Sequence, residues 1–360
     1  MNYNYLKIFS KLICQLILCI FTFSGCSSNL YQENELSISN GKELEEFNIP
    51  KDMEAEQSNT LENTTKTEQS KPSKSECTDQ FEIPTNDNKT FSSPGSSPPT
   101  LEPAITEEDY SEYFNDLNGT AVLYNASDMH YSIFRSELAV TRRSPCSTFK
   151  IISSLIALEN NIIEPDDSMR TWSGEVFWNE NWNRDIDFYN AFHTSCVWYF
   201  REVIDAIGEE KMQEELNKLS YGNLDISDWE GKLNTNNNNR ALTGFWIESS
   251  LAISPKEQTE VLSRIFRTDS VYSEKTKQEL KRVMQIEQLE NSEISIYGKT
   301  GMGKAHGIVV DAWFTGFAEN SRRKETIYFC VHLGQSDNKN FSSTTAKEIA
   351  IQLITKYWTY

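Results

Sequence analysis

Basic side chains, histidine and long apolar runs are all scarce in this chain, and each shortage excludes a class of protein. Among 360 residues, 34 Lys and Arg face 53 Asp and Glu, for a formal net charge of −19 at pH 7. This balance argues against a nucleic-acid partner, because phosphate binding needs a basic face. Four histidines and no tight Cys/His cluster predict no metal site. No apolar run reaches about 18 residues, which excludes a protein with several membrane-spanning helices.

The first 26 residues follow the pattern of a signal peptide. Lys7 and Lys11 precede an apolar stretch, residues 12–23, that is too short to span a bilayer but has the length of a signal h-region. The stretch ends in Phe23-Ser24-Gly25-Cys26, and small residues before a cysteine resemble the lipobox of bacterial lipoproteins. We therefore expect residues 1–26 to be a lipoprotein signal peptide and Cys26 to be lipidated. An ordinary cleaved signal with an incidental cysteine is the alternative.

Residues 27–105 are predicted to form a disordered acidic spacer. They hold seven of the ten prolines, no tryptophan, and 6 Lys against 15 Asp and Glu. A segment this polar cannot bury enough apolar surface to offset its ordering entropy. With a lipid at Cys26, which anchors stably through two acyl chains, the expected location is outside the cell membrane. A long spacer suits a host with a single membrane, so the host is expected to be Gram-positive.

Residues 106–360 have the composition of one enzyme-sized unit of mixed structure. All eight tryptophans lie there. Apolar periodicity and turn residues predict the following elements: strands at 120–125, 131–135, 294–298, 312–318 and 326–333, and helices at 147–160, 209–219, 255–266 and 344–358. Strands at both ends with helices between them indicate one antiparallel sheet in an α+β fold. Sheet edges are expected, but no pattern predicts an oligomeric state.

The first segment with chemical potential is Ser147-Thr148-Phe149-Lys150. On a helix, residues at i and i+3 share a face, so the Lys150 amine can reach the Ser147 hydroxyl. A serine nucleophile needs a neighbouring base, and a lysine can be that base only when burial lowers its pKa. By itself the motif is weak, because a helix N-cap followed by a surface lysine also matches it.

Two further short motifs follow. Ser195-Cys196-Val197 lies in an aromatic-rich stretch, where a serine is more often a packing residue. Lys299-Thr300-Gly301 follows a predicted strand, where it can present a cation, a hydroxyl and bare backbone to a substrate carboxylate and carbonyl; a polar hairpin strand is the alternative.

Together and in this order, the three motifs resemble those of the penicillin-recognising serine enzymes, S-x-x-K, S-x-[NV] and K-T-G. Val197 at the third position of the second motif, Tyr221-Gly222-Asn223, and Phe245-Trp246 ahead of Ile253-Ser254 are similar to the class D β-lactamases, or oxacillinases. The resemblance covers residues 106–360. It implies an antiparallel sheet flanked by helices, with an all-helical subdomain.

The resemblance also implies roles for individual residues. Ser147 becomes acylated, Lys150 is carboxylated on its side-chain nitrogen by CO2 and acts as general base for both acylation and deacylation, and Ser195 relays a proton toward the leaving nitrogen. The remaining implied roles are these: backbone N–H groups of Ser147 and Met302 as the oxyanion hole, Val197 and Trp246 around the lysine carbamate, and Lys299, Thr300 and Gly301 on the substrate side. The expected substrates are β-lactam antibiotics, and no cofactor is expected besides the CO2 or bicarbonate that modifies Lys150.

Some features depart from the family pattern or leave alternatives open. Many family members hold the drug carboxylate with an arginine near the start of the last helix, but residues 339–344 contain none; Lys304 or the Lys299-Thr300 pair are the candidates. Residues 224–244 form a longer segment than usual, expected to be a loop near the site. A disulfide between Cys146 and Cys196 is the less favoured alternative to free thiols. A β-lactam sensor that stays acylated, a D,D-peptidase and an inactive wall-binding lipoprotein are the alternatives to a β-lactamase.

Overall fold

The computed structural model describes residues 102–286, 293–335 and 340–359. The predicted signal peptide and nearly all of the predicted spacer lie outside these residues. The strands are β1 (Ala104–Glu107), β2 (Gly119–Asn125), β3 (His130–Phe134), β4 (Ile294–Ala305), β5 (Ile308–Asn320) and β6 (Glu325–Gly334). The helices are α2 (Ser111–Phe114), α3 (Ser136–Ala139), α4 (Lys150–Glu159), α5 (Phe188–His193), α6 (Val197–Ile207), α7 (Glu209–Leu219), α8 (Pro255–Phe266), α9 (Glu274–Met284) and α10 (Ser343–Thr359).

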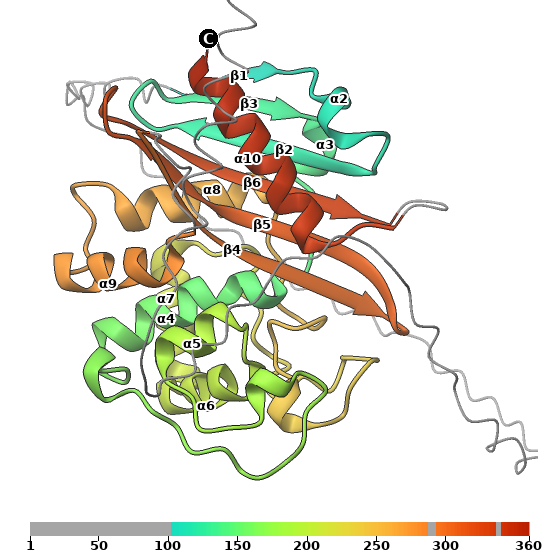
Figure 1. Ribbon diagram of the computed structural model, residues 1–360, viewed down its shortest axis with the longest axis vertical. Helices are drawn as coiled ribbons and strands as arrows, with labels where there is room; N and C mark the ends of the chain where they lie inside the picture. Colours follow the sequence, from blue (N-terminus) through green and yellow to red (C-terminus); the bar gives the residue numbers. More distant parts are fainter. Residues whose placement is uncertain (1–101, 287–292, 336–339, 360) are drawn as a thin grey trace, which may run out of the picture. The chain divides into compact units, whose positions relative to one another are not determined.

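The strands form one six-stranded sheet in the order β1-β3-β2-β6-β5-β4, shown in Figure 1. Neighbouring strands are antiparallel except β1, which pairs with β3 in parallel. The centre of the sheet joins the two ends of the described chain, since Gly119 of β2 pairs with Leu333 of β6. The predicted α+β fold with strands pairing across the chain is confirmed.

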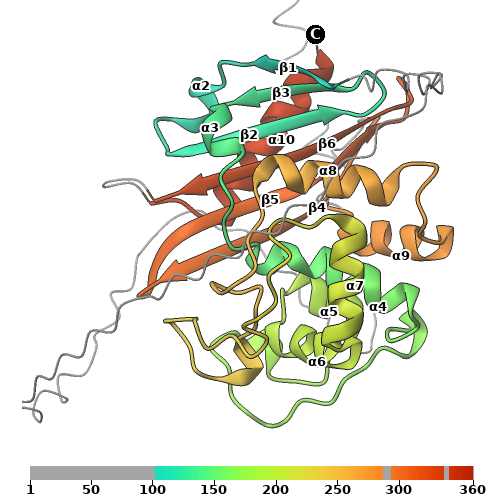
Figure 2. The same ribbon diagram turned by 180° about the vertical axis from the view of Figure 1, so that it is seen from behind.

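The sheet separates two hydrophobic cores, one on each face. Because side chains alternate along a strand, Phe329 and Val331 of β6 pack in the core beneath α10, whereas Tyr328 belongs to the core on the other face. Figures 1 and 2 show α10 on one face of the sheet and α8 with α4, α5, α6, α7 and α9 on the opposite face, while α2 packs on the α10 side. The catalytic candidates belong to this second, helical side.

Helix α4 forms the centre of the helical side. Its residues from Lys150 to Leu158 are all buried, and it packs against α6 and α9. Its run of Ile, Leu, Ser and Ala carries no charge between Lys150 and Glu159, which suits a helix enclosed all round. Nearby, α8 begins with a capping box between Ser254 and Glu257. Among the described residues, no helix combines the length and apolarity needed to cross a bilayer.

Several boundaries differ from those predicted: β5 extends beyond the predicted 312–318 at both ends, β2, β3, β6 and α10 differ by one residue at one or both ends, and three further differences have a clear physical reason. Strand β1 begins at Ala104, two residues before the expected start of the domain, and its four side chains are exposed, so composition carried no signal of it. The helix predicted from Ser147 begins as a 3-10 turn, Cys146–Phe149, and becomes α-helical at Lys150. Strand β4 continues through Lys299-Thr300-Gly301 to Ala305, because its partner β5 supplies hydrogen bonds along this whole length.

Candidate active site

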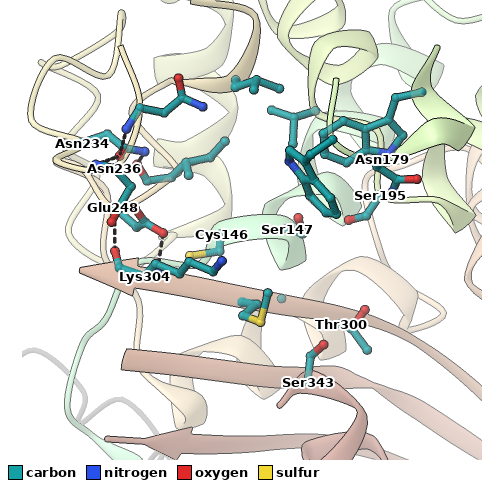
Figure 3. A pocket seen from close by; sticks show the side chains of 18 of the residues that line it. Cys146, Ser147, Asn179, Ser195, Asn234, Asn236, Glu248, Thr300, Lys304 and Ser343 are labelled. Carbon is teal, nitrogen blue, oxygen red and sulfur yellow. Dashed lines mark hydrogen bonds between the residues drawn. The ribbon is translucent and has the colours of Figure 1, made fainter. Parts of the chain in front are cut away.

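A cavity of about 570 Å³ lies where the helical side meets strand β4 (Figure 3). Five parts of the chain line it: the Cys146–Phe149 turn, the segment from Trp178 to Val197, the loop from Asn234 to Glu248, β4, and the first residue of α10. The lining residues are Cys146, Ser147, Trp178, Asn179, Trp182, Thr194, Ser195, Val197, Asn234, Asn236, Asn237, Leu242, Ile247, Glu248, Thr300, Gly301, Met302, Lys304 and Ser343.

Ser147 and Lys150 are held together by the turn that begins α4. The Lys150 amine donates a hydrogen bond of 3.1 Å to Ser147 Oγ, and its side chain is 1% exposed. Its nitrogen lies 5.3 Å from the ring centre of Phe200. Burial lowers the pKa of Lys150 to about 8. A buried lysine therefore stands within reach of the candidate nucleophile, with part of its population neutral near pH 7.

The backbone is unusual at both candidate serines. Cys146, directly before Ser147, has a φ angle of 48°, and Ser195 itself has a φ angle of 58°; both lie in the left-handed region that non-glycine residues seldom occupy. The N–H of Cys146 donates to the Trp246 carbonyl at 2.9 Å, which ties the turn to the loop before α8. Burial raises the pKa of the Cys146 thiol to about 12, so this thiol is not a competing nucleophile. Cys146 and Cys196 are free cysteines.

Ser195 pairs with Lys299 across the cavity. The Lys299 amine donates to Ser195 Oγ at 3.1 Å and to the Thr300 carbonyl at 3.1 Å. Burial and then the positive charge of Lys150 lower the pKa of Lys299 to about 7. The structure thus brings together four predicted residues that are far apart in sequence, as two lysine–serine pairs.

Gly301 lets strand β4 approach the nucleophile turn. A Cβ at this position would lie 2.9 Å from Thr148 Cγ2 and 3.1 Å from the Pro145 carbonyl oxygen. Thr300 and Met302 flank Gly301, and both line the cavity. The oxyanion hole from the N–H groups of Ser147 and Met302 stays a prediction, and both residues stand at the cavity wall.

Val197 and Trp246 were predicted to surround a carboxylated Lys150. Val197 begins α6 and lines the cavity, while Trp246 is fully buried and stacks on Phe149 with ring centres 6.2 Å apart. Trp246 Nε1 is a buried donor with no hydrogen-bond partner among the described residues. An unpartnered buried donor on the ring that stacks against Phe149, the residue before Lys150, fits an anionic carbamate on Lys150, because unpaired polar groups are costly in an interior.

The loop predicted near the site does line the cavity, through Asn234, Asn236 and Asn237. The sequence did not single out Glu248 or Ser343, which also line it. Glu248 directly follows Phe245-Trp246-Ile247, and this closeness to the Phe-Trp motif was the one feature of the sequence that could have indicated its place at the site. Among the residues that the structure describes, no arginine lines the cavity near the start of α10; Ser343 lines it there, and Lys304 lines the far end. No group of three metal-ligating side chains occurs within residues 102–286, 293–335 and 340–359.

Comparison with known proteins assigns the family. The model of the penicillin binding protein transpeptidase domain matches residues 110–355. The "Regulatory protein BlaR1" of Bacillus licheniformis is 31% identical over 71% of this chain, which spans only 40% of that relative's length. The "Probable beta-lactamase YbxI" of Bacillus subtilis is 30% identical, with 70% of this chain and 86% of the relative covered.

Solved structures give the same result. The C-terminal domain of the Bacillus licheniformis BlaR penicillin-receptor superposes with a TM-score of 0.62 at 30% identity, covering 72% of this chain and 99% of that domain. A class D β-lactamase from Bacillus subtilis superposes with a TM-score of 0.58 at 28% identity, covering 69% and 95%. The chain belongs to the penicillin-binding serine enzyme superfamily. Its relatives within this superfamily are class D β-lactamases and the BlaR1 penicillin-receptor domain.

Proposed function

We propose that the protein is a class D serine β-lactamase, which opens the β-lactam ring through an acyl-enzyme on Ser147 and then hydrolyses the ester. The observation that carries this proposal is the 3.1 Å contact between Ser147 Oγ and a fully buried Lys150 whose pKa is lowered to about 8. A nucleophile with a base at hydrogen-bond distance is what acyl transfer needs.

Acylation follows from the two lysine–serine pairs. Lys150, in its carboxylated form, accepts the hydroxyl proton of Ser147 while Oγ attacks the lactam carbonyl carbon. The carbon–nitrogen bond then breaks, the Ser195 hydroxyl delivers a proton to the leaving nitrogen, and Lys299 returns one to Ser195 at 3.1 Å. The backbone N–H groups of Ser147 and Met302 stabilise the negative charge that develops on the carbonyl oxygen. Lys299 and Thr300 attract the carboxylate of the substrate.

Hydrolysis of the ester needs a base for the incoming water. Carboxylation of Lys150 supplies an anionic base, and Val197 and Trp246 are the residues that hold it. CO2 reacts only with a neutral amine, and burial of Lys150 provides that form near neutral pH. The Trp246 Nε1 donor, buried and unpartnered among the described residues, supports this assignment.

Intact-protein mass spectrometry tests the reaction. The protein is mixed with benzylpenicillin in bicarbonate buffer and sampled from seconds to an hour. We expect an adduct on Ser147 that appears and then disappears while the drug is consumed. An absence of any adduct would contradict the assignment of the nucleophile.

A β-lactam receptor is the second candidate, because the chain matches the receptor domain of BlaR over 99% of that domain. A receptor stays acylated, so a persistent adduct without turnover favours this function. A D,D-peptidase is the third; hydrolysis of a D-Ala-D-Ala peptide faster than of benzylpenicillin favours it.

We also propose that Cys26 carries a lipid and that the enzyme acts outside the cell membrane. The support is the sequence pattern at residues 7–26, with a positive start, an apolar stretch and small residues before the cysteine. Labelling with an alkyne fatty acid in the host is expected to tag the wild type but not Cys26→Ser. Equal labelling of both would contradict the anchor.

A further inference from the structure

The Asn-rich loop and the turn between β4 and β5 meet at one end of the cavity. Asn234 and Asn236 line that end from the loop, and Lys304 lines it from β4. Figure 3 shows Asn236, Glu248 and Lys304 on one side of Ser147, while Ser195 and Thr300 lie on the other. The cavity therefore has two different ends along β4.

Both the nitrogen and the oxygen of the Asn236 side-chain amide form hydrogen bonds to the β4–β5 turn. Its Nδ2 donates to the Lys304 carbonyl oxygen at 2.6 Å, and its Oδ1 accepts from the Gly307 N–H at 2.7 Å. The same Nδ2 also donates to Glu248, and Glu248 accepts from the backbone N–H of Lys304. We call Asn236, Glu248, Lys304 and Gly307 the clasp.

The clasp is connected to the nucleophile turn. The backbone N–H of Glu248 donates to Ser144 Oγ at 2.8 Å, and Ser144 Oγ donates to the Trp246 carbonyl at 3.1 Å. Ser144 lies three residues before Ser147. The loop, the β4–β5 turn and the nucleophile turn are thus joined by consecutive hydrogen bonds.

The turn needs such support, because its local structure is irregular. The register of β4 and β5 shifts between Gly303 and Lys304, and His306 and Gly307 have φ angles of 49° and 79°. The shift at Gly303 and Lys304 disrupts the ladder locally, whereas the two left-handed residues form a two-residue hairpin turn that suits twisted strands. Each neutral hydrogen bond changes an equilibrium by about 2- to 12-fold, so losing the bonds of one amide is measurable.

We propose that Asn236 is a positioning residue, which holds the β4–β5 turn so that Lys304 forms a fixed wall for the acyl side chain of the β-lactam. The proposal rests on the proposed function, which places the substrate carboxylate near Lys299 and Thr300 and the lactam carbonyl at Ser147. The other end of the substrate then extends along β4 toward the clasp. Loss of the Asn236 amide is therefore expected to slow the reaction of substrates that carry an acyl side chain, and not the reaction of the lactam ring itself.

Two substrates distinguish an effect on the acyl side chain from an effect on the lactam ring. Benzylpenicillin has an aromatic acyl side chain, and 6-aminopenicillanic acid has none. The second-order rate constant for acylation of Ser147 is measured with each by quenched mass spectrometry on the full-length protein. Asn236→Ala is expected to slow acylation by benzylpenicillin about 5- to 10-fold and to leave 6-aminopenicillanic acid within twofold of the wild type. The matched control is Asn238→Ala, because Asn238 is exposed and makes no side-chain hydrogen bond to any described residue; it is expected to behave as the wild type with both substrates.

Hydrogen exchange gives a readout that needs no substrate. The amides of Lys304 and Gly307 donate within the clasp, so peptides covering residues 303–308 are expected to exchange faster in Asn236→Ala but not in Asn238→Ala. An equal loss with both substrates, or no change in either rate, would overturn the role of Asn236. A wild-type protein that no β-lactam acylates would instead overturn the proposed function, while the exchange experiment still decides whether the clasp holds the turn.

Discussion

At the scale of single residues, the site depends on two buried lysines, each hydrogen-bonded to a serine that lines the cavity. Lys150 and Lys299 are 1% and 5% exposed, and each has its amine 3.1 Å from a serine hydroxyl. Burial is the largest cause of the lowered pKa of each, and the charge of Lys150 lowers the pKa of Lys299 further. Lys150, with the higher pKa of about 8, contacts the candidate nucleophile Ser147, and Lys299 contacts the candidate proton relay Ser195.

These pKa values predict a pH dependence for acylation. The neutral, basic form of Lys150 increases with pH up to about 8, and the protonated form of Lys299 decreases above about 7. In bicarbonate-depleted buffer, the rate of Ser147 acylation is therefore expected to peak between about pH 7 and 8. Turnover is expected to fall in acid, where CO2 leaves the lysine, and to recover with added bicarbonate. Bicarbonate-independent turnover that stays constant from pH 5 to 8 would contradict the carboxylated base.

Trp246 provides a second residue-scale prediction. Trp246→Phe keeps an aromatic ring against Phe149 but removes the Nε1 donor, so the carbamate loses a hydrogen bond to a charged group, about 1.5–3 kcal/mol. We expect the bicarbonate concentration for half-maximal carboxylation to rise at least tenfold. The carbamate carbon is followed by NMR with 13C-labelled bicarbonate. The control is Trp313→Phe, which removes the Nε1 of another buried tryptophan whose donor has no partner among the described residues; a similar rise there would show a general packing effect.

At the scale of elements, strand β4 and the Cys146–Phe149 turn work as one unit. The strand carries Thr300 and Met302 into the cavity, and Gly301 permits the close contact with Thr148 and Pro145 that sets the strand's distance from Ser147. The sequence showed the Lys-Thr-Gly motif but not the surface against which its glycine packs.

Gly301→Ala is expected to force β4 and the turn apart. Its Cβ would lie 2.9 Å from Thr148 Cγ2, so we expect a loss of about 1–3 kcal/mol in the free energy of unfolding and more than tenfold slower acylation. Gly174→Ala serves as the comparison, since its Cβ would meet nothing within 4 Å and only the φ of +89° is strained. That variant is expected to lose about 1–2 kcal/mol with acylation unchanged. Denaturant unfolding and acylation rates measure both effects, and normal acylation in Gly301→Ala would contradict the role of the contact.

At the scale of the whole molecule, distant parts of the chain close the sheet and build the cavity. Asn125 at the end of β2 donates to Glu325 at the start of β6, 200 residues later. The cavity is lined by residues from Cys146 to Ser343. One edge strand of the sheet, β1, pairs its four residues with His130–Ile133 of β3, and its first two residues belong to the segment predicted as spacer.

Two truncations test where the folded unit begins. A chain of residues 102–360 is expected to be acylated at the rate of the longer protein, because the family match begins at residue 110 and the described elements begin at Ala104. A chain of residues 108–360 lacks β1 and exposes the edge of β3, so a lower melting temperature and more aggregation are expected. Calorimetry and light scattering compare the two. Identical melting of both chains would show that β1 contributes nothing to stability.

Much of the fold was predictable, for identifiable reasons. Helices α7 and α8 have the predicted bounds, since each has a clear apolar stripe and a start or stop signal: a glycine before α7 and a serine with a proline before α8. Strand β1 was not predictable, because its side chains are all exposed and backbone pairing alone holds it. The 3-10 start of the nucleophile helix was also missed; apolar spacing does not distinguish it from an α-helix over one turn.

The sequence by itself determined the pairing of Ser147 with Lys150, because three residues along one helical turn bring their side chains to the same face wherever the helix is packed. It also determined, through three ordered motifs, the family to which the chain belongs. Tertiary structure alone decided the contacts between distant segments: Lys299 reaches Ser195 across 104 residues, and Asn236 reaches Lys304 across 68. Such contacts depend on how a strand, a helix and a loop pack together, and no local periodicity encodes that packing. For the same reason, the clasp at the end of the cavity could not be recognised in a run of asparagines.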